Sequence, residues 1–209
     1  MTTHLHEQTR NALSLRLHRA NSWLTRAQRE QDDPDARFIF LWIAFNAAYA
    51  NDLGDVGGFS ETRLFRQFVA KLCELDSERK LYDVVWKAFP HSIRLLLQNR
   101  YVFQPFWDFQ RDPSARADWE REFSHSRERA LRALGQGDTA TVLAVVFDRL
   151  YVLRNQLVHG GATWNSSVNR DQVRDGAEIL ARVVPIVLQI MADNAAAFPG
   201  EPYYPVVDI

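Results

Sequence analysis

Residues 139–153, with the sequence TATVLAVVFDRLYVL, constrain the fold more than any other segment of the chain. Apolar residues crowd this segment too closely for a one-sided amphipathic stripe. They predict a helix that is buried on most of its circumference. These residues are Val142, Leu143, Val145, Val146, Phe147, Leu150, Tyr151 and Leu153. Asp138 or Thr139 is the expected N-cap, and Gly160-Gly161 is the expected end of the helix.

The last turn of this helix carries Arg154, Asn155 and His159, polar side chains that a purely structural helix would not need there. At roughly 100° and about 1.5 Å per residue, Asn155 and His159 share one face, about 6 Å apart along the axis. Arg154 lies about 140° around the helix from His159. Either the long arginine stem brings its guanidinium back toward the imidazole, or residues from a second copy of the helix pair with Arg154 and His159. Histidine changes charge near neutral pH, so a histidine beside a fixed cation favours proton transfer at a phosphate.

The order of Arg154, Asn155 and His159 near the end of a long helix resembles the HEPN superfamily (higher eukaryotes and prokaryotes nucleotide-binding domains). The surrounding sequence LRNQLVHGGATWNSSVNRDQV, with the earlier segment FIFLWIAFNAAYA, looks like the Apea-like branch of bacterial HEPN proteins. The resemblance covers about residues 35–50 and 140–192. It implies an all-α helical bundle.

The resemblance also implies a metal-independent endoribonuclease that needs no cofactor. The 2′-hydroxyl of the RNA substrate would attack the phosphate and leave a 2′,3′-cyclic phosphate and a 5′-hydroxyl. His159 would act as general base or acid, Arg154 would stabilise the phosphorane oxygens, and Asn155 would position phosphate or imidazole. Family members usually pair two motif helices across a two-fold axis, which implies a homodimer. Many serve as toxins or in phage defence and are restrained by an antitoxin partner.

Other interpretations stay open. Arg154 could pair with a surface acid, and His159 could simply be a cation at a helix C-terminus. Trp164, Asn165 and Arg170, in the loop after the motif, are candidate RNA contacts or packing residues. The chain could therefore be a non-catalytic HEPN-type module that binds a protein partner or a nucleotide, or a plain helical scaffold.

The rest of the chain predicts about seven or eight helices in one domain, 1–209, with an inserted helical subdomain at about 54–135 as an alternative organisation. The expected helices cover about 5–30, 35–51, from Ser60 onward, 77–89, 91–98, 112–135 ending at Gly135, and 171–194. The second of these is apolar all round except for Asn46, which is expected to organise the core or to touch a substrate. A glycine-rich loop is expected at 54–58. The segment 99–113, with five aromatic residues and two prolines, is expected to be a loop pinned to the core by its rings, or a base-stacking surface.

Composition narrows the function classes. The net charge of −1 excludes a broadly basic surface that coats nucleic acid, so any RNA contact must be local. A single cysteine, Cys73, excludes an intrachain disulfide and fits a reducing cytoplasm. The polar N-terminus and the short apolar runs predict neither a signal peptide nor a membrane span. The motifs HExxH, CxxC, GxGxxG and the P-loop are absent, so zinc-enzyme, NTPase and dinucleotide-binding interpretations have no support, and no metal is expected.

Overall fold

The computed structural model describes residues 2–49, 51–52, 61–114, 116–167, 169–202, 204 and 206. The chain is all-α, as the sequence predicts, with 78% of the structure helical. The expected glycine loop at 54–58 and the expected helix start at Ser60 lie outside the described residues. No described helix combines the length and the apolar character that crossing a membrane requires.

The elements follow one another as α1 (Thr2–Ala27), α2 (Pro34–Tyr49), β1 (Asn51–Asp52), α3 (Glu61–Leu75), α4 (Lys80–Asp83), the π-helical turn η1 (Val84–Ala88), α5 (Pro90–Gln98), the 3₁₀ turn η2 (Arg100–Val102), α6 (Gln104–Arg111), α7 (Trp119–Gln136), α8 (Thr139–Val158), α9 (Arg170–Asp193), the 3₁₀ turn η3 (Ala195–Ala197) and β2 (Glu201–Pro202). The short strands β1 and β2 pair in antiparallel fashion. The predicted helix at 77–89 is therefore α4 continued by η1, and Pro90 begins α5 rather than only ending the preceding helix.

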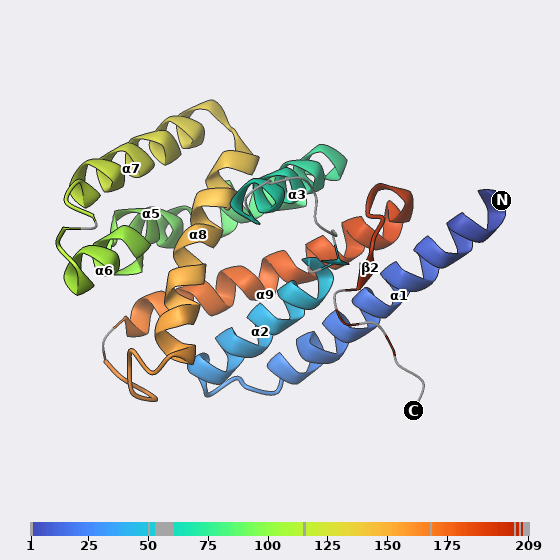
Figure 1. Ribbon diagram of the computed structural model, residues 1–209, viewed down its shortest axis with the longest axis horizontal. Coiled ribbons are helices and arrows are strands. Elements are labelled where there is room, and N and C mark those ends of the chain that lie inside the picture. Colours follow the sequence, from blue (N-terminus) through green and yellow to red (C-terminus); the bar gives the residue numbers. More distant parts are fainter. Residues whose placement is uncertain are drawn as a thin grey trace.

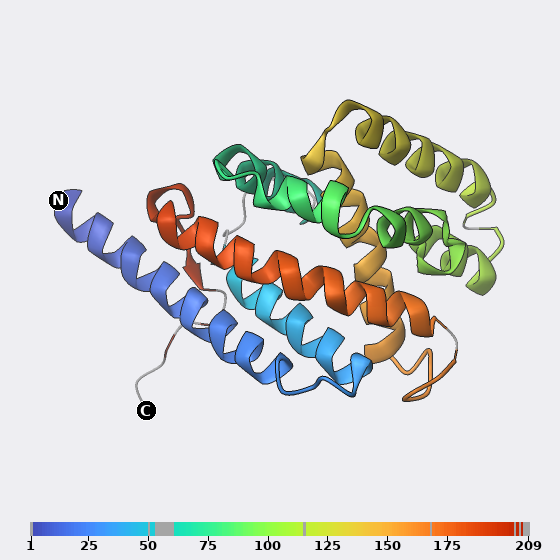
Figure 2. The ribbon, with the colours of Figure 1, turned by 180° about the vertical axis from the view of Figure 1, so that it is seen from behind.

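Two groups of helices enclose the core. Helices α1, α2 and α9 pack side by side as one layer, with α2 between the other two (Figure 1, and Figure 2 from behind). Helix α8 crosses one side of this layer and contacts α3, α5 and α7 as well as α2 and α9. Because α8 meets neighbours on so many sides, ten of its residues are buried, in agreement with the prediction from its sequence.

The ends of α8 have the capping expected of them. The Asp138 side chain accepts a hydrogen bond from the backbone N–H of Thr141 (3.0 Å), so Asp138 is the N-cap. His159 is the first residue after the helix, and Gly160 follows it with a φ of 69°, which glycine adopts without strain. The backbone N–H of Gly161 donates to the carbonyl of Gln156 (2.7 Å), so one of the last carbonyl groups is satisfied.

Two predictions for the middle of the chain are wrong in detail. Helix α7 continues through Gly135 and ends at Gln136, because Gly137 supplies the left-handed φ (71°) that terminates it. The segment 99–113 is not a plain loop, since it contains η2 and α6. Some of its rings are buried as expected, and the guanidinium of buried Arg149 from α8 lies 4.5 Å from the ring centroid of Phe103.

The C-terminal tail lies on its own chain. Phe198 is buried in the core, and the Arg19 guanidinium donates to the carbonyl of Tyr204 (2.6 Å). Arg16, only 2% exposed, donates to the carbonyls of Ala48 and Phe198. Arg16 thereby ties α1 to the C-terminal end of α2 and to the tail, and burial lowers its pKa to about 10.

The close approach of α9 to α2 and α8 gives a test of this packing. A Cβ at Gly176 would lie 2.9 Å from Leu150 Cδ2 and 3.0 Å from Phe38 Cε2, whereas a Cβ at Gly135 in α7 would meet nothing within 4 Å. Gly176→Ala is expected to lower the free energy of unfolding by about 1–3 kcal/mol through overpacking. Gly135→Ala, the control, is expected to raise it by roughly 0.5–1 kcal/mol. Urea unfolding followed by circular dichroism measures both, and equal effects would contradict the packing described.

Candidate functional site

The three motif residues lie together where α8 ends. Arg154 Nη1 donates to Asn155 Oδ1 (2.9 Å), and both residues are half-buried. His159 is exposed, and its backbone N–H donates to the carbonyl of Asn155 (3.0 Å). Within the described residues, no direct contact joins the Arg154 guanidinium to the His159 imidazole. Arg154 and His159 therefore stay apart within one chain, as their positions around the helix predict.

Arg154 is half-buried and has no acid partner within the described residues, whereas two other half-buried arginines are paired with acids. Arg37 pairs with Glu178, and Arg170 pairs with Asp35. No carboxylate in the described part of the chain forms an ion pair with Arg154, whose guanidinium is held by the neutral amide of Asn155. The expectation that Arg154 might simply pair with a surface acid is therefore not what the structure shows. Its charge is available to an anionic group that reaches the end of α8.

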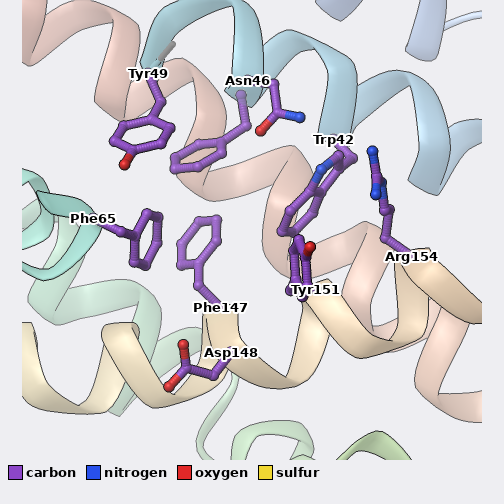
Figure 3. Close-up of a pocket in the computed structure, with 9 residues that line it drawn as sticks. Trp42, Asn46, Tyr49, Phe65, Phe147, Asp148, Tyr151 and Arg154 are labelled. Carbon is purple, nitrogen blue, oxygen red and sulfur yellow. The ribbon is translucent and has the colours of Figure 1, made fainter. Parts of the chain in front are cut away.

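Beside this arginine, a cavity of about 350 Å³ opens between α2, α3 and α8 (Figure 3). A volume of this size is typical of small-molecule sites. Six of its nine lining residues are aromatic. The lining consists of Trp42, Phe45, Asn46 and Tyr49 from α2, Phe65 from α3, and Phe147, Asp148, Tyr151 and Arg154 from α8. We call it the aromatic cavity. Arg154 belongs both to the motif and to the cavity wall, so the two features form one continuous site.

Asp148 is the acid of this site, and the sequence analysis did not identify it. Its side chain is 40% exposed, and Arg66 Nη2 lies 3.8 Å from its Oδ2. Partial burial raises the pKa of Asp148 above its ordinary value, although Arg66, Arg149 and Arg129 act in the opposite direction. Asp148 is the only acid within the apolar run 139–153, and an acid in a helix that must be buried is the signal that could have identified it.

Asn46 and Trp42 contribute two further polar groups to the cavity wall. Asn46, which the sequence left between a core role and a substrate role, is half-buried and lines the aromatic cavity (Figure 3). Trp42 is 6% exposed, and its buried Nε1–H has no acceptor within the described residues. Buried donors are nearly always paired, so an unpaired one costs free energy and needs an explanation.

The loop after the motif is fastened to the N-terminal end of α2. Arg170 donates to both carboxylate oxygens of Asp35 (3.1 and 3.0 Å), and the backbone N–H of Asn165 donates to Asp35 Oδ2 (2.8 Å). The Trp164 indole donates to Asp33 Oδ2 (3.0 Å), while the residue stays 75% exposed. Arg170 and the Asn165 backbone therefore have packing roles. RNA contact by Trp164, Asn165 and Arg170 stays a prediction, and of the three the Trp164 ring is the most accessible.

Gln156, inside the motif, connects the end of α8 to the aromatic segment. Its Nε2 donates to the carbonyl of Tyr101 (2.6 Å), which also accepts from Trp107 Nε1 (2.8 Å). Its Oε1 accepts from Asn169 Nδ2 (2.9 Å). Tyr101 and Trp107 are 43% and 36% exposed. The two exposed rings thus lie near the motif, although they are more than 40 residues from it in sequence.

Within the described residues, no group of three or more His, Cys, Asp or Glu side chains is placed to hold a metal ion. The Asn155 amide holds Arg154, Asn46 and Asp148 line the same cavity, and the exposed His159 imidazole follows at the end of α8. This set can bind an anion at Arg154, exchange a proton at His159 and accept hydrogen bonds at Asp148.

The Arg170–Asp35 ion pair, which holds the loop after the motif to the N-terminal end of α2, can be tested by mutation. Asp35 is 8% exposed, so Arg170→Gln leaves a buried carboxylate without its cation and is expected to cost about 2–3 kcal/mol of unfolding free energy. Arg174→Gln is the control, because Arg174 pairs with Asp171 at a site where both side chains are mostly exposed. That change is expected to stay within about 0.5 kcal/mol. Urea unfolding of the two variants measures the difference, and similar costs would show that the anchor contributes little.

The raised pKa of Asp148 predicts that its ionised carboxylate lowers the stability of the folded chain. Below the ordinary pKa of an aspartate, folded and unfolded chains are both protonated and the carboxyl costs nothing. As pH rises through the raised pKa, the folded chain must ionise a partly buried group and loses stability. Asp148→Asn is therefore expected to raise the Tm near neutral pH, with the gain vanishing in acid. Asp171→Asn, on the surface, is the control. A lower Tm for Asp148→Asn at neutral pH would mean that the Arg66 pair outweighs burial.

Comparisons with models of protein families, with characterised proteins and with solved structures gave no match. The resemblance to the HEPN superfamily therefore rests on the motif residues and on their position at the end of α8.

Proposed function

We propose that this chain is a metal-independent endoribonuclease of the HEPN type, with its site at the C-terminal end of α8. The observation that carries the proposal is the arrangement of Arg154, Asn155 and His159. An amide holds a guanidinium that no acid in the described part of the chain neutralises, and an exposed imidazole follows one turn after that amide. A cation without an acid partner is ready to bind the phosphate of a substrate.

Each residue has a chemical role in this mechanism. RNA carries its own nucleophile, so the protein needs only to orient the 2′-hydroxyl, move protons and stabilise charge. His159 removes the proton of the 2′-hydroxyl or donates one to the departing 5′-oxygen. Arg154 stabilises the negative charge on the phosphorane, and Asn155 keeps the guanidinium in place. The products are a 2′,3′-cyclic phosphate and a 5′-hydroxyl.

A homodimer would complete the site. Tyr151 and Val158 are 48% and 51% exposed, and with half-buried Asn155 they follow helical spacing along α8. We call these three residues the α8 stripe. A second α8 placed on this stripe across a two-fold axis would bury its apolar surface and bring two arginines and two histidines into one cleft. The separation of Arg154 from His159 on one helix would then matter less, because the arginine of one copy could act with the histidine of the other.

The resemblance also suggests the biological setting. A nuclease with such a cleft would damage the RNA of its own cell unless a partner restrained it. We therefore propose a cytoplasmic toxin or phage-defence effector that an antitoxin holds inactive.

The second candidate function is a non-catalytic module that binds a nucleotide or a protein partner. The aromatic cavity favours it, because an enclosed set of rings can hold a flat ligand without any cleavage chemistry. The net charge of −1 also fits a binding module, since it leaves little general attraction for RNA.

Cleavage of mixed RNA by the purified chain in the presence of EDTA tests the nuclease function. Arg154→Ala and His159→Ala are each expected to lower the rate by roughly 100-fold or more, since each removes a group that acts in the transition state. Arg174→Ala and His125→Ala change the same residue types at exposed positions on α9 and α7 and are expected to cleave like the wild type.

The ends of the products give the second readout. Cyclic phosphates in the wild-type reaction are expected from attack by the 2′-hydroxyl. Cleavage that needs a divalent metal, or that survives in folded His159→Ala, would contradict the proposal. A folded dimer that cuts no RNA would favour the binding module.

A further inference from the structure

We infer that the aromatic cavity binds an unpaired guanine base of the RNA substrate and so selects the position of cleavage. This inference rests on the proposed function for the identity of the substrate. It assigns a role to residues that take no part in the chemistry of cleavage. Asp148, Arg66 and the surrounding rings are the residues concerned.

The walls of the cavity suit a flat aromatic ligand. The rings come from α2, α3 and α8, and the Tyr151 ring lies beside Trp42 (centroids 6.1 Å apart). Figure 3 shows Phe65 and Phe147 facing the same space from α3 and α8. Proteins that bind single-stranded RNA stack its unpaired bases on aromatic side chains in this way.

The polar groups at the end of the cavity select among the bases. The Asp148 carboxylate lines the cavity and accepts hydrogen bonds. Arg66 is not one of the lining residues, but its Nη2 lies 3.8 Å from Asp148 Oδ2 and can donate to a base that is paired with this carboxylate. Guanine presents two adjacent donors on its pairing edge, N1–H and the 2-amino group, next to the O6 acceptor. Two carboxylate oxygens match the two donors, and the arginine matches O6. Adenine, cytosine and uracil each present an acceptor where guanine presents one of these donors.

The position of Arg154 favours a nucleotide over other aromatic ligands. Asp148 and Arg154 are six residues apart on α8, about 9 Å along the axis, so a base at Asp148 can direct its phosphate toward the motif. A cationic ligand in the cage of rings would be repelled by Arg154. A phenylalanine side chain of a protein partner would cover Asp148 without offering its carboxylate a hydrogen bond, and a tyrosine or tryptophan would offer one donor where guanine offers two.

The raised pKa of Asp148, which lines the cavity, agrees with a site that is complete only when occupied. A carboxyl whose ionisation is hindered by burial gains most when a ligand donates hydrogen bonds to it.

Calorimetric titration of the full-length chain with the 5′-monophosphates of guanosine, inosine, adenosine, cytidine and uridine tests the inference. GMP is expected to bind at least about tenfold more tightly than AMP, CMP and UMP. IMP, which lacks the 2-amino group, is expected to fall between them. Asp148→Asn is expected to weaken GMP binding by roughly tenfold or more, because a neutral amide loses the charge-assisted pair. Asp83→Asn, at a surface ion pair with Lys87, is the matched control.

The outcomes separate this inference from the proposed nuclease. Cleavage in EDTA without preference for GMP, or GMP binding that Asp148→Asn leaves unchanged, would overturn the guanine pocket while the nuclease stands. Selective GMP binding by a chain that cuts no RNA would support the guanine site and contradict the proposed nuclease function. Since Asp148→Asn is expected to be at least as stable as the wild type at neutral pH, misfolding would not explain a loss of binding.

Discussion

Burial of α8 is the constraint on which the rest of the structure depends. Ten of its 20 residues are buried, and the helices α2, α3, α5, α7 and α9 all pack against it. Removing that much apolar surface from water is the main driving force available to a chain of this size. The bundle leaves the α8 stripe and the last turn of the helix open to solvent. The motif residues are thus presented by a helix that is buried along much of its length, and a site built on such an element keeps its geometry.

Within the described residues, two polar groups at the site lack a full set of partners, as does the buried Nε of Arg149 outside it. Arg16 is also buried, yet backbone carbonyls accept its hydrogen bonds. By contrast, Arg154 has the Asn155 amide and the Tyr151 ring as neighbours but no acid partner within the described residues, and burial hinders the ionisation of Asp148. Such groups lower stability unless a ligand completes them, and they concentrate at functional sites. Their occurrence around one cavity is the physical argument that this cavity binds something.

The sequence predicted much of the fold because helical periodicity is a local signal. The limits of α8 and α9 agree with prediction to within a residue or two, and Gly160-Gly161 ends α8 as expected. The cavity could not be predicted, because it depends on how α2, α3 and α8 pack. Trp42 and Phe65 look like ordinary core residues in the sequence. The packing partner of Arg170 could not be predicted for the same reason, since Asp35 lies 135 residues away. Segment 99–113 was predicted as a loop because its prolines hid the short helix α6, where proline occupies the first turn.

The central claim is that two copies of α8 meet along the α8 stripe to form one cleft. Sedimentation velocity of wild type and Val158→Asp, with RNA cleavage measured on the same samples, tests it most directly. A dimeric, active wild type and a folded, monomeric, inactive Val158→Asp are the expected results, because the new charge would be buried at the two-fold axis. Leu131→Asp, at a comparably exposed position on α7, should remain dimeric and active. A monomeric wild type that cleaves RNA, or an active Val158→Asp monomer, would contradict the account.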